Sequence, residues 1–172
     1  IVTDFSNELH NLMQDNLHIT FRSTELKNEP YLARFICKDE SVLCANQTYL
    51  KRASIINHLD DLDDHEFISL ARKHTEFDHL IFTYQGQEIH QHLVGSLSFN
   101  DKEVIYRAVK EGFGLAVLPL YLVKQDIVSG EIETILPEYK LQSSNFYALY
   151  TQRKKESALV NKFIDFVQES LA

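Results

Sequence analysis

Histidines are the residues of this sequence that most invite metal-binding chemistry, because the chain contains eight of them. His90 and His92 are two residues apart, and His58 and His65 border an acidic segment at residues 60–64. Two histidines with a spacing of two lie on one face of a strand, which suits two ligands of one ion. No cysteine or third histidine recurs at a spacing that would complete the ligand set, so solvent-facing strand residues explain the pair better. The sequence therefore predicts no metal site and no cofactor.

Nucleophilic catalysis would need a serine or cysteine beside a histidine and an orienting carboxylate. The chain shows neither a G-x-S-x-G elbow nor a family motif of catalytic cysteine and histidine. The run Gly112-Phe113-Gly114 lacks the third glycine of a dinucleotide fingerprint and the lysine of a P-loop. Hydrolase, kinase and dehydrogenase activities therefore have no support, and we expect a binding protein rather than an enzyme.

The segment from residue 100 to residue 119 carries the strongest structural pattern. Its apolar residues at 104, 105, 108 and 109 share one face of a helix, and Asn100 with the glutamate three residues later resembles a capping box. Gly112 suits the left-handed residue that ends a helix, and Gly114 would allow a close approach of the backbone to a neighbour. A buried strand follows, and Pro119 suits the first position of the next helix.

Hydrophobic periodicity and turn residues predict further elements along the chain. We expect strands near residues 17–21, 31–37, 41–45, 66–70, 80–84, 92–99, 132–136 and 145–151, and helices near 47–53, 119–129 and from 157 onward. The last helix is predicted to turn Leu159, Val160, Phe163, Ile164, Phe166, Val167 and Leu171 inward. Such an alternation of strands and helices is typical of the α/β class.

Composition restricts the partners of the chain. With 25 acidic and 17 basic residues the formal net charge is −8, which has the wrong sign for a surface that neutralises DNA phosphates. No apolar run approaches the roughly 18 residues needed to span a bilayer. Cys37 and Cys44 are close together in a stretch that resembles a hairpin, and reduced, buried thiols explain them better than a disulfide framework or a redox switch.

Five motifs occur in an order and at a spacing that together resemble one family. They are Val42-Leu43-Cys44-Ala45-Asn46 with Tyr49-Leu50; Asp61-Leu62-Asp63-Asp64-His65; Gly112 to Pro119; Ser129-Gly130-Glu131-Ile132 with Ile135-Leu136-Pro137; and Phe146-Tyr147-Ala148-Leu149-Tyr150 before a final amphipathic helix. This series resembles the effector-binding domain of the LysR-type transcriptional regulators over nearly the whole chain. In the family pattern His65 is expected to order a turn.

The resemblance implies a fold and a division of the chain. It implies two Rossmann-like lobes joined by two crossover strands, the periplasmic-binding-protein-like type II architecture. Lobe I would comprise residues 1–44 and 147–172, and lobe II residues 45–146. The family opens this domain with a strand and a helix, whereas Ile1-Val2-Thr3 already resembles the second strand, so we expect an N-terminally truncated domain that lacks the family's winged helix-turn-helix.

The resemblance also implies a function. We expect a ligand-sensing and oligomerisation module in the cytoplasm that binds a small effector, such as a carboxylate, between its lobes. The full-length regulator would be a homodimer or tetramer and would reach DNA only through its missing N-terminal domain. An extracytoplasmic solute-binding protein of a transporter shares the architecture and remains the alternative.

In folds of this type ligands lie at the carboxyl ends of strands, near helix N-termini. The effector-binding candidates are therefore Ser6, Asn7, Arg22, Ser23, Thr24, Phe82, Ser98, Asn100 and Phe113. Arg22 offers a planar donor fork to a carboxylate, or it pairs with an acidic surface neighbour. Asn100 could serve only as a helix cap, and Phe82 and Phe113 could wall a pocket or pack in the core.

Overall fold

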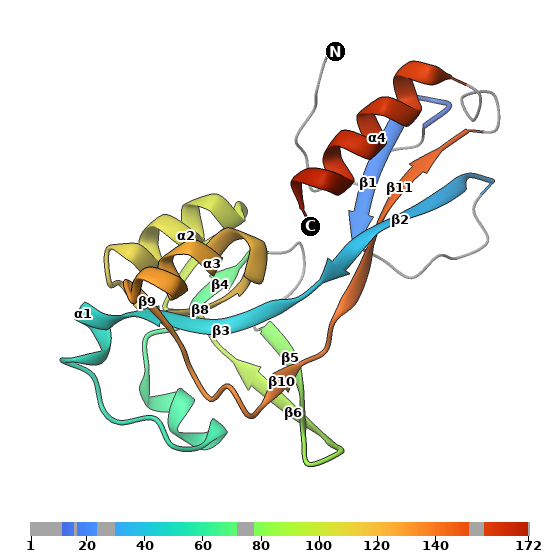
Figure 1. Cartoon of the computed structure of the whole chain (residues 1–172). Helices are drawn as coiled ribbons and strands as arrows, with labels where there is room; N and C mark the ends of the chain where they lie inside the picture. The colour runs from blue at the N-terminus through green and yellow to red at the C-terminus, as the bar shows by residue number, and fades with distance from the viewer. Residues whose placement is uncertain (1–11, 16, 24–29, 72–77, 152–156, 172) are drawn as a thin grey trace. The chain divides into compact units, whose positions relative to one another are not determined.

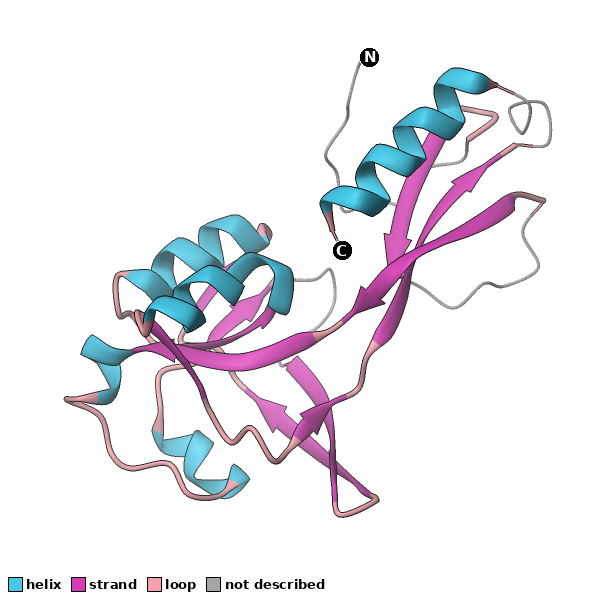
Figure 2. Cartoon of the chain, viewed as in Figure 1, coloured by secondary structure: helices cyan, strands magenta, loops and turns pink. Residues whose placement is uncertain are grey.

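The computed structural model describes residues 12–15, 17–23, 30–71, 78–151 and 157–171 (Figures 1 and 2). The chain divides into two compact units, which are described separately below. Unit 1 comprises Ile1–Asp39 and Ser144–Ala172, and unit 2 comprises Glu40–Ser143. The lobe limits expected from the sequence, 44/45 and 146/147, lie a few residues further along the chain. Three candidate residues, Ser6, Asn7 and Thr24, lie outside the described residues.

Unit 1 is a three-stranded antiparallel sheet packed against one helix. The strands are β1 (Ile19–Ser23), β2 (Leu32–Asp39) and β11 (Ser144–Tyr150), in the order β1-β11-β2, and the helix is α4 (Ala158–Ser170). Figure 1 shows α4 lying along this sheet. Its core consists of Ile36, Ala148, Val160 and Ile164. Because β1 and β2 both run antiparallel to β11, their carboxyl ends lie at the same edge of the sheet.

Helix α4 begins where the sequence predicts, but its buried face is narrower. The Ser157 side chain caps the helix by accepting a hydrogen bond from the backbone N–H of Val160. Leu159 and Phe166, both predicted to point inward, are 68% and 63% exposed. Successive residues of a helix are rotated by about 100° around its axis. The buried residues of α4 are therefore three or four positions apart. Leu159 and Phe166, which are one or two positions from a buried residue, point to solvent.

Unit 2 contains a sheet in which two sets of strands meet. β3 (Ser41–Asn46) lies between β8 (Leu115–Pro119) and β9 (Ile132–Thr134) and is antiparallel to both. β4 (Ile68–Leu70) and β7 (Leu97–Phe99) form a parallel pair. An isolated parallel bridge between Phe67, the residue before β4, and Leu115 of β8 links the pair β4-β7 to the three-stranded set β8-β3-β9.

Two helices cover one face of this sheet, as Figure 1 shows. They are α2 (Lys102–Lys110) and α3 (Leu120–Ser129), and Gly130 ends α3 with a left-handed φ of 77° as predicted. The core under them consists of Cys44, Ile68, Ile105, Val109, Ala116, Leu118, Val123 and Ile132. Two short elements, helix α1 (Gln47–Leu50) and the 3-10 turn η1 (Leu59–Asp64), contribute Tyr49, Leu59 and Leu62 to a second core on the other face.

A hairpin in unit 2 is absent from the sequence-based prediction. β5 (Asp78–Tyr84) and β6 (Gln87–Leu93) pair antiparallel around a two-residue turn, and β10 (Lys140–Leu141) pairs with β5. Both turn residues have positive φ, 50° at Gln85 and 81° at Gly86, as a tight hairpin of this kind requires. The single strand predicted at 92–99 is wrong, because this segment holds the end of β6 and all of β7.

The two cysteines do not share a hairpin, contrary to the prediction. Cys37 lies in β2, which pairs with β11, whereas Cys44 lies in β3, which pairs with β8 and β9. Both thiols are free, and burial raises the pKa of Cys44 to about 12. Among the described helices, none combines the length and apolar character that crossing a lipid bilayer requires.

The glycines of the run lie where the sequence predicts, but Pro119 is the N-cap of α3 and not its first residue. Gly114 allows the close approach that was expected, because a Cβ atom added there would lie 2.2 Å from the carbonyl oxygen of Glu66. The N–H of the next residue, Leu115, donates to this same oxygen at 2.8 Å. Only glycine lets the backbone leave α2 and enter β8 so close to the start of β4.

Candidate functional site

The carboxyl ends of two parallel strands form the best candidate site in unit 2. β4 and β7 are in register, with Ser69 opposite Ser98 and Leu70 opposite Phe99. Helix α2 begins at Lys102, directly after β7. The strand ends and the start of the helix therefore lie at one edge of the sheet, which is where α/β proteins of this type bind ligands.

Two serine hydroxyls lie at this edge in different environments. Ser98 is exposed, whereas Ser69 is only 7% exposed, and its Oγ atom has no hydrogen-bond partner among the described residues. The backbone of Gly95 passes beside Ser69, because a Cβ atom at Gly95 would lie 2.0 Å from that Oγ. A buried hydroxyl without a partner costs about 1–3 kcal/mol, so an incoming polar group that paired with it would gain that free energy.

Sequence reasoning missed Ser69. A serine between two apolar strand residues carries no distinguishing local signal, and only the pairing with β7 places it beside Ser98. Ser69 is buried because the backbone of Gly95 passes beside its side chain, and the hydrophobic periodicity of the sequence does not predict this contact.

The start of α2 differs from the prediction in its capping residue. Asp101, and not Asn100, is the N-cap, and its carboxylate accepts a hydrogen bond from the N–H of Glu103 at 2.7 Å. Asn100 is exposed between the end of β7 and this cap. The capping explanation of Asn100 is therefore wrong, and its side chain stays a candidate for ligand contact. The Asp101 carboxylate adds negative charge at a helix end that otherwise favours anions.

The two phenylalanines are not brought together with these polar groups. Phe82 is 1% exposed in the core, where its ring makes an edge contact with Tyr139 at a centroid distance of 6.5 Å. Phe113 is 56% exposed, but it precedes β8 at the amino ends of the parallel strands. It therefore lies at the opposite edge of the sheet from Ser98.

Unit 1 places two candidates at the carboxyl end of β1. Arg22 lies opposite Tyr147 of β11, and Ser23 follows it as an exposed residue. The Ser23 hydroxyl donates to the carboxylate of Asp39 at the end of β2. The Ser23 side chain is therefore already engaged, and a ligand would have to share or replace this hydrogen bond.

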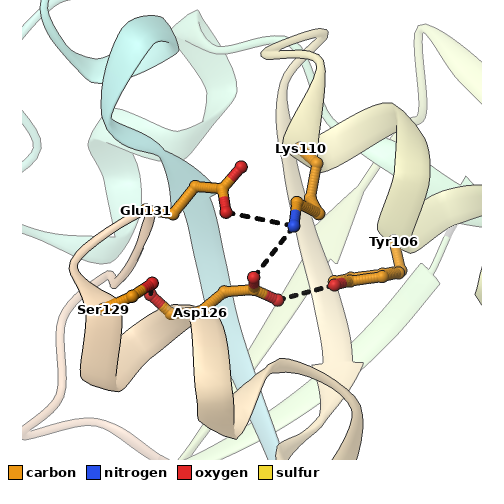
Figure 3. A network of polar contacts seen from close by, with 5 residues as sticks. All are labelled: Tyr106, Lys110, Asp126, Ser129 and Glu131. Carbon is orange, nitrogen blue, oxygen red and sulfur yellow. Dashed lines mark hydrogen bonds and ion pairs between the residues drawn. The ribbon is translucent and has the colours of Figure 1, made fainter.

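A polar network joins α2 to α3 and the segment before β9 (Figure 3). The Asp126 carboxylate accepts hydrogen bonds from the Tyr106 hydroxyl at 2.6 Å and from Lys110 Nζ at 2.9 Å, and Lys110 also pairs with Glu131 at 3.0 Å. Burial by itself raises the pKa of Asp126, but these hydrogen bonds outweigh it, so the pKa is lowered. The carboxylates raise the pKa of Lys110, and Asp126 raises that of Tyr106. Each charged group of this network has at least one partner within it, so the network holds α2 against α3 and the segment before β9.

A second polar cluster lies where β3 ends and β4 begins. The Tyr49 hydroxyl accepts the backbone N–H of Glu66 at 3.1 Å and contacts His65 Nδ1 at 3.0 Å. His65 thus lies at the turn between η1 and β4, tied to α1 through Tyr49. Among the described residues, no group of three histidine, cysteine, aspartate or glutamate side chains is placed to bind a metal ion.

Comparison with known proteins identifies the fold and the family. The model of the LysR substrate binding domain matches residues 1–172. The chain belongs to this family. Among solved structures, the CrgA regulatory domain of Neisseria meningitidis, a LysR-type transcriptional regulator, superposes with a TM-score of 0.83 at 20% identity, covering 97% of this chain and 81% of CrgA. The α/β fold of periplasmic-binding-protein type II that the sequence predicted is confirmed.

Other LysR-type regulators are also similar to this chain. Full-length AphB of Vibrio cholerae, a virulence activator, gives a TM-score of 0.79 at 21% identity and covers 98% of this chain and 57% of AphB. The curated relatives include the transcriptional activators TtdR of Escherichia coli strain UTI89 (29% identity; 91% of this chain, 50% of TtdR) and AaeR of strain K12 (28%; 92% and 52%). The LysR-family chain spans about half the length of these relatives. They are transcription regulators and not enzymes, and nothing among them supports the transporter alternative.

Proposed function

We propose that this LysR-family domain is the effector-sensing part of a longer, DNA-binding transcription regulator that acts in the cytoplasm. Two facts support this proposal. The chain corresponds to about half of relatives that are named transcriptional activators. Its own net charge of −8 is unsuited to DNA, so contact with phosphates would fall to another part of the protein.

The proposed effector contact in unit 2 consists of Ser69, Ser98 and Asn100. The observation that carries it is the unpartnered hydroxyl of Ser69, opposite Ser98 in the parallel pair of β4 and β7. Hydroxyl and amide groups can both donate and accept, so this set suits a small ligand with several oxygens. The Asp101 carboxylate beside it favours a ligand whose hydroxyl groups, and not its charge, face unit 2.

The proposed contact in unit 1 is the guanidinium of Arg22, with Ser23 as its neighbour. Arginine binds carboxylates through two parallel hydrogen bonds, so its involvement would make the effector a carboxylate. The candidates Ser6, Asn7 and Thr24 belong to the same proposal and lie outside the described residues. Hence the effector class depends on Arg22, whereas the existence of a binding site depends on Ser69 and Ser98.

The proposed signal is a shift in conformational populations. An effector that binds one arrangement of the domain more tightly than another shifts the equilibrium by that difference in affinity. In the full-length protein, which we propose to be a homodimer or tetramer, this shift would change how the subunits present their DNA-binding parts.

A thermal-shift screen with small carboxylates, hydroxy acids and aromatic acids tests the proposal, because binding to the native state raises the melting temperature. We expect at least one compound to stabilise the chain, and Ser98→Ala to remove most of that shift. Ser129→Ala, at the exposed end of α3, is the matched control and should keep it. A shift that survives both Ser98→Ala and Ser69→Ala would reject the unit 2 site.

The same screen tests the effector class. Arg22→Ala should abolish a carboxylate-induced shift, whereas Arg107→Ala, which removes an exposed arginine of α2, should leave it unchanged. An unchanged shift with Arg22→Ala would remove Arg22 from the site and leave the unit 2 contact standing.

A further inference from the structure

Three strands of unit 1 place an arginine and two aromatic rings in one row. Arg22 of β1 lies opposite Tyr147 of β11, which in turn lies opposite Phe35 of β2. Side chains next to each other along a strand point to opposite faces of the sheet. Phe21 and Ala148, which flank this row along their strands, pack in the core beneath α4. The row therefore lies on the face of the sheet that points away from the helix.

A β-bulge in β2 sets the direction of the two rings. The register between β2 and β11 shifts between Phe146, which pairs with Cys37, and Tyr147, which pairs with Phe35. Ile36 is the extra residue, and both Ile36 and Cys37 contact the core beneath α4. Bulges of this kind re-aim the side chains beside them. Here the Phe35 ring is 47% exposed and meets the Tyr147 ring edge-on, with their centroids 6.0 Å apart.

The charges on this face are positive, although the whole chain has a net charge of −8. Lys38 of β2 is exposed and lies opposite Asn145, two residues before the row on β11 and thus on the same face. With Arg22 it gives the face two cations. Asp39 is the acidic residue of these strands, and it turns to the other face, where it accepts the Ser23 hydroxyl. The face is therefore suited to an anion.

We propose that the effector of this domain is an aromatic carboxylate that binds on this face. Its ring packs against Phe35 and Tyr147, and its carboxylate pairs with the guanidinium of Arg22, while Lys38 adds attraction for the charge. Asn145 Nδ2 donates to the Tyr147 hydroxyl at 3.2 Å and so holds that ring in place. The inference rests on the function proposed above, because it takes Arg22 as an effector contact, and it adds the chemical class of the ligand.

The arrangement explains why a ring and a charge would be recognised together. Neighbouring strands lie about 4.8 Å apart, so a ring stacked over the central Tyr147 is one strand away from Arg22. Pairs of aromatic rings contribute free energy beyond the area that they bury, and a planar guanidinium matches a carboxylate through two parallel hydrogen bonds. A ligand that lacks either group would lose one of these contributions.

Ligand-observed NMR titration of the purified chain at neutral pH tests the proposal with three probes of similar size. Sodium benzoate carries both groups, cyclohexanecarboxylate keeps the charge without the aromatic ring, and benzamide keeps the ring without the charge. We expect benzoate to bind about threefold to tenfold more tightly than cyclohexanecarboxylate. We expect it to bind at least about tenfold more tightly than benzamide.

Two substitutions locate the binding on the sheet. Phe35→Leu keeps an apolar side chain but removes the ring, so it should abolish the preference for benzoate over cyclohexanecarboxylate. Phe166→Leu, which removes a ring that is 63% exposed on α4, is the matched control and should keep the preference. Lys38→Gln should weaken both carboxylates by about twofold to fivefold, whereas Lys162→Gln on α4 should leave them unchanged. Circular dichroism checks that each variant is folded.

Failure of this inference differs from failure of the function on which it rests. Equal binding of benzoate and cyclohexanecarboxylate, or a preference that persists in Phe35→Leu, would overturn the aromatic class and leave carboxylate binding at Arg22 standing. An equal change in Phe166→Leu would overturn the location on this face. If neither carboxylate binds the unsubstituted chain, the aromatic site is wrong, and the thermal-shift screen decides the effector-sensing function separately.

Discussion

Replacing Asp126 by asparagine tests how the polar network of α2 and α3 stabilises unit 2. Asparagine keeps the shape of the side chain but removes its charge, and its NH2 group cannot accept a hydrogen bond. The Tyr106 hydroxyl donates to one carboxylate oxygen and Lys110 to the other, so one of these bonds is lost. A hydrogen bond to a charged group contributes about 1.5–3 kcal/mol. Lys110 keeps Glu131 as a partner, so we assign it no further cost.

We therefore expect Asp126→Asn to lower the free energy of unfolding by about 2 kcal/mol. With a urea dependence of about 2 kcal/mol per molar, the midpoint of the transition falls by about 1 M. Urea unfolding followed by far-ultraviolet circular dichroism measures this change. Glu103→Gln, which breaks an exposed pair with Arg107 in the same helix, should cost less than about 0.5 kcal/mol. Equal effects of the two substitutions would refute the reasoning.

Two further predictions concern packing and pH. Gly114→Ala should destabilise the chain by about 1–3 kcal/mol, because its methyl group would collide with the Glu66 backbone, and a midpoint equal to that of the unsubstituted chain in urea would contradict this. The pKa values of the Asp126 and Asp61 carboxyls are lowered in the folded state. Their contribution is therefore present above the unfolded value of 3.8 and is lost as the pH falls through the lower folded values. Unfolding experiments between pH 5 and pH 2.5 should show this loss, and Asp126→Asn should reduce its slope.

Local signals in the sequence were sufficient for much of the fold. The series of α2, Gly112, Gly114, β8 and α3 follows from helix periodicity, glycine positions and a proline, all of which act within a few residues. Strands β2 and β3 were also placed by their apolar runs. Their partners were not, because pairing is decided by distant segments: β2 joins β11, and β3 joins β8 and β9.

The misses in the candidate sites have the same origin. The tight turn at Gln85 and Gly86 lacks the usual asparagine or aspartate before the glycine, so the sequence pattern did not predict the β5–β6 hairpin. Without that hairpin, His79 could not be recognised as the neighbour of His90 and His92. Ser69 was likewise invisible until β4 was paired with β7. Residue types indicated the kind of chemistry, whereas cross-strand register determined which residues meet.

Calorimetric titration of a stabilising carboxylate or hydroxy acid into the purified chain tests the central claim, effector sensing by this LysR-family domain, most directly. We predict saturable binding of one molecule per chain, weakened at least tenfold by Ser98→Ala and unchanged by Ser129→Ala. Binding that is insensitive to substitution of Ser69, Ser98 and Arg22, or the absence of binding by every compound of the screen, would contradict it.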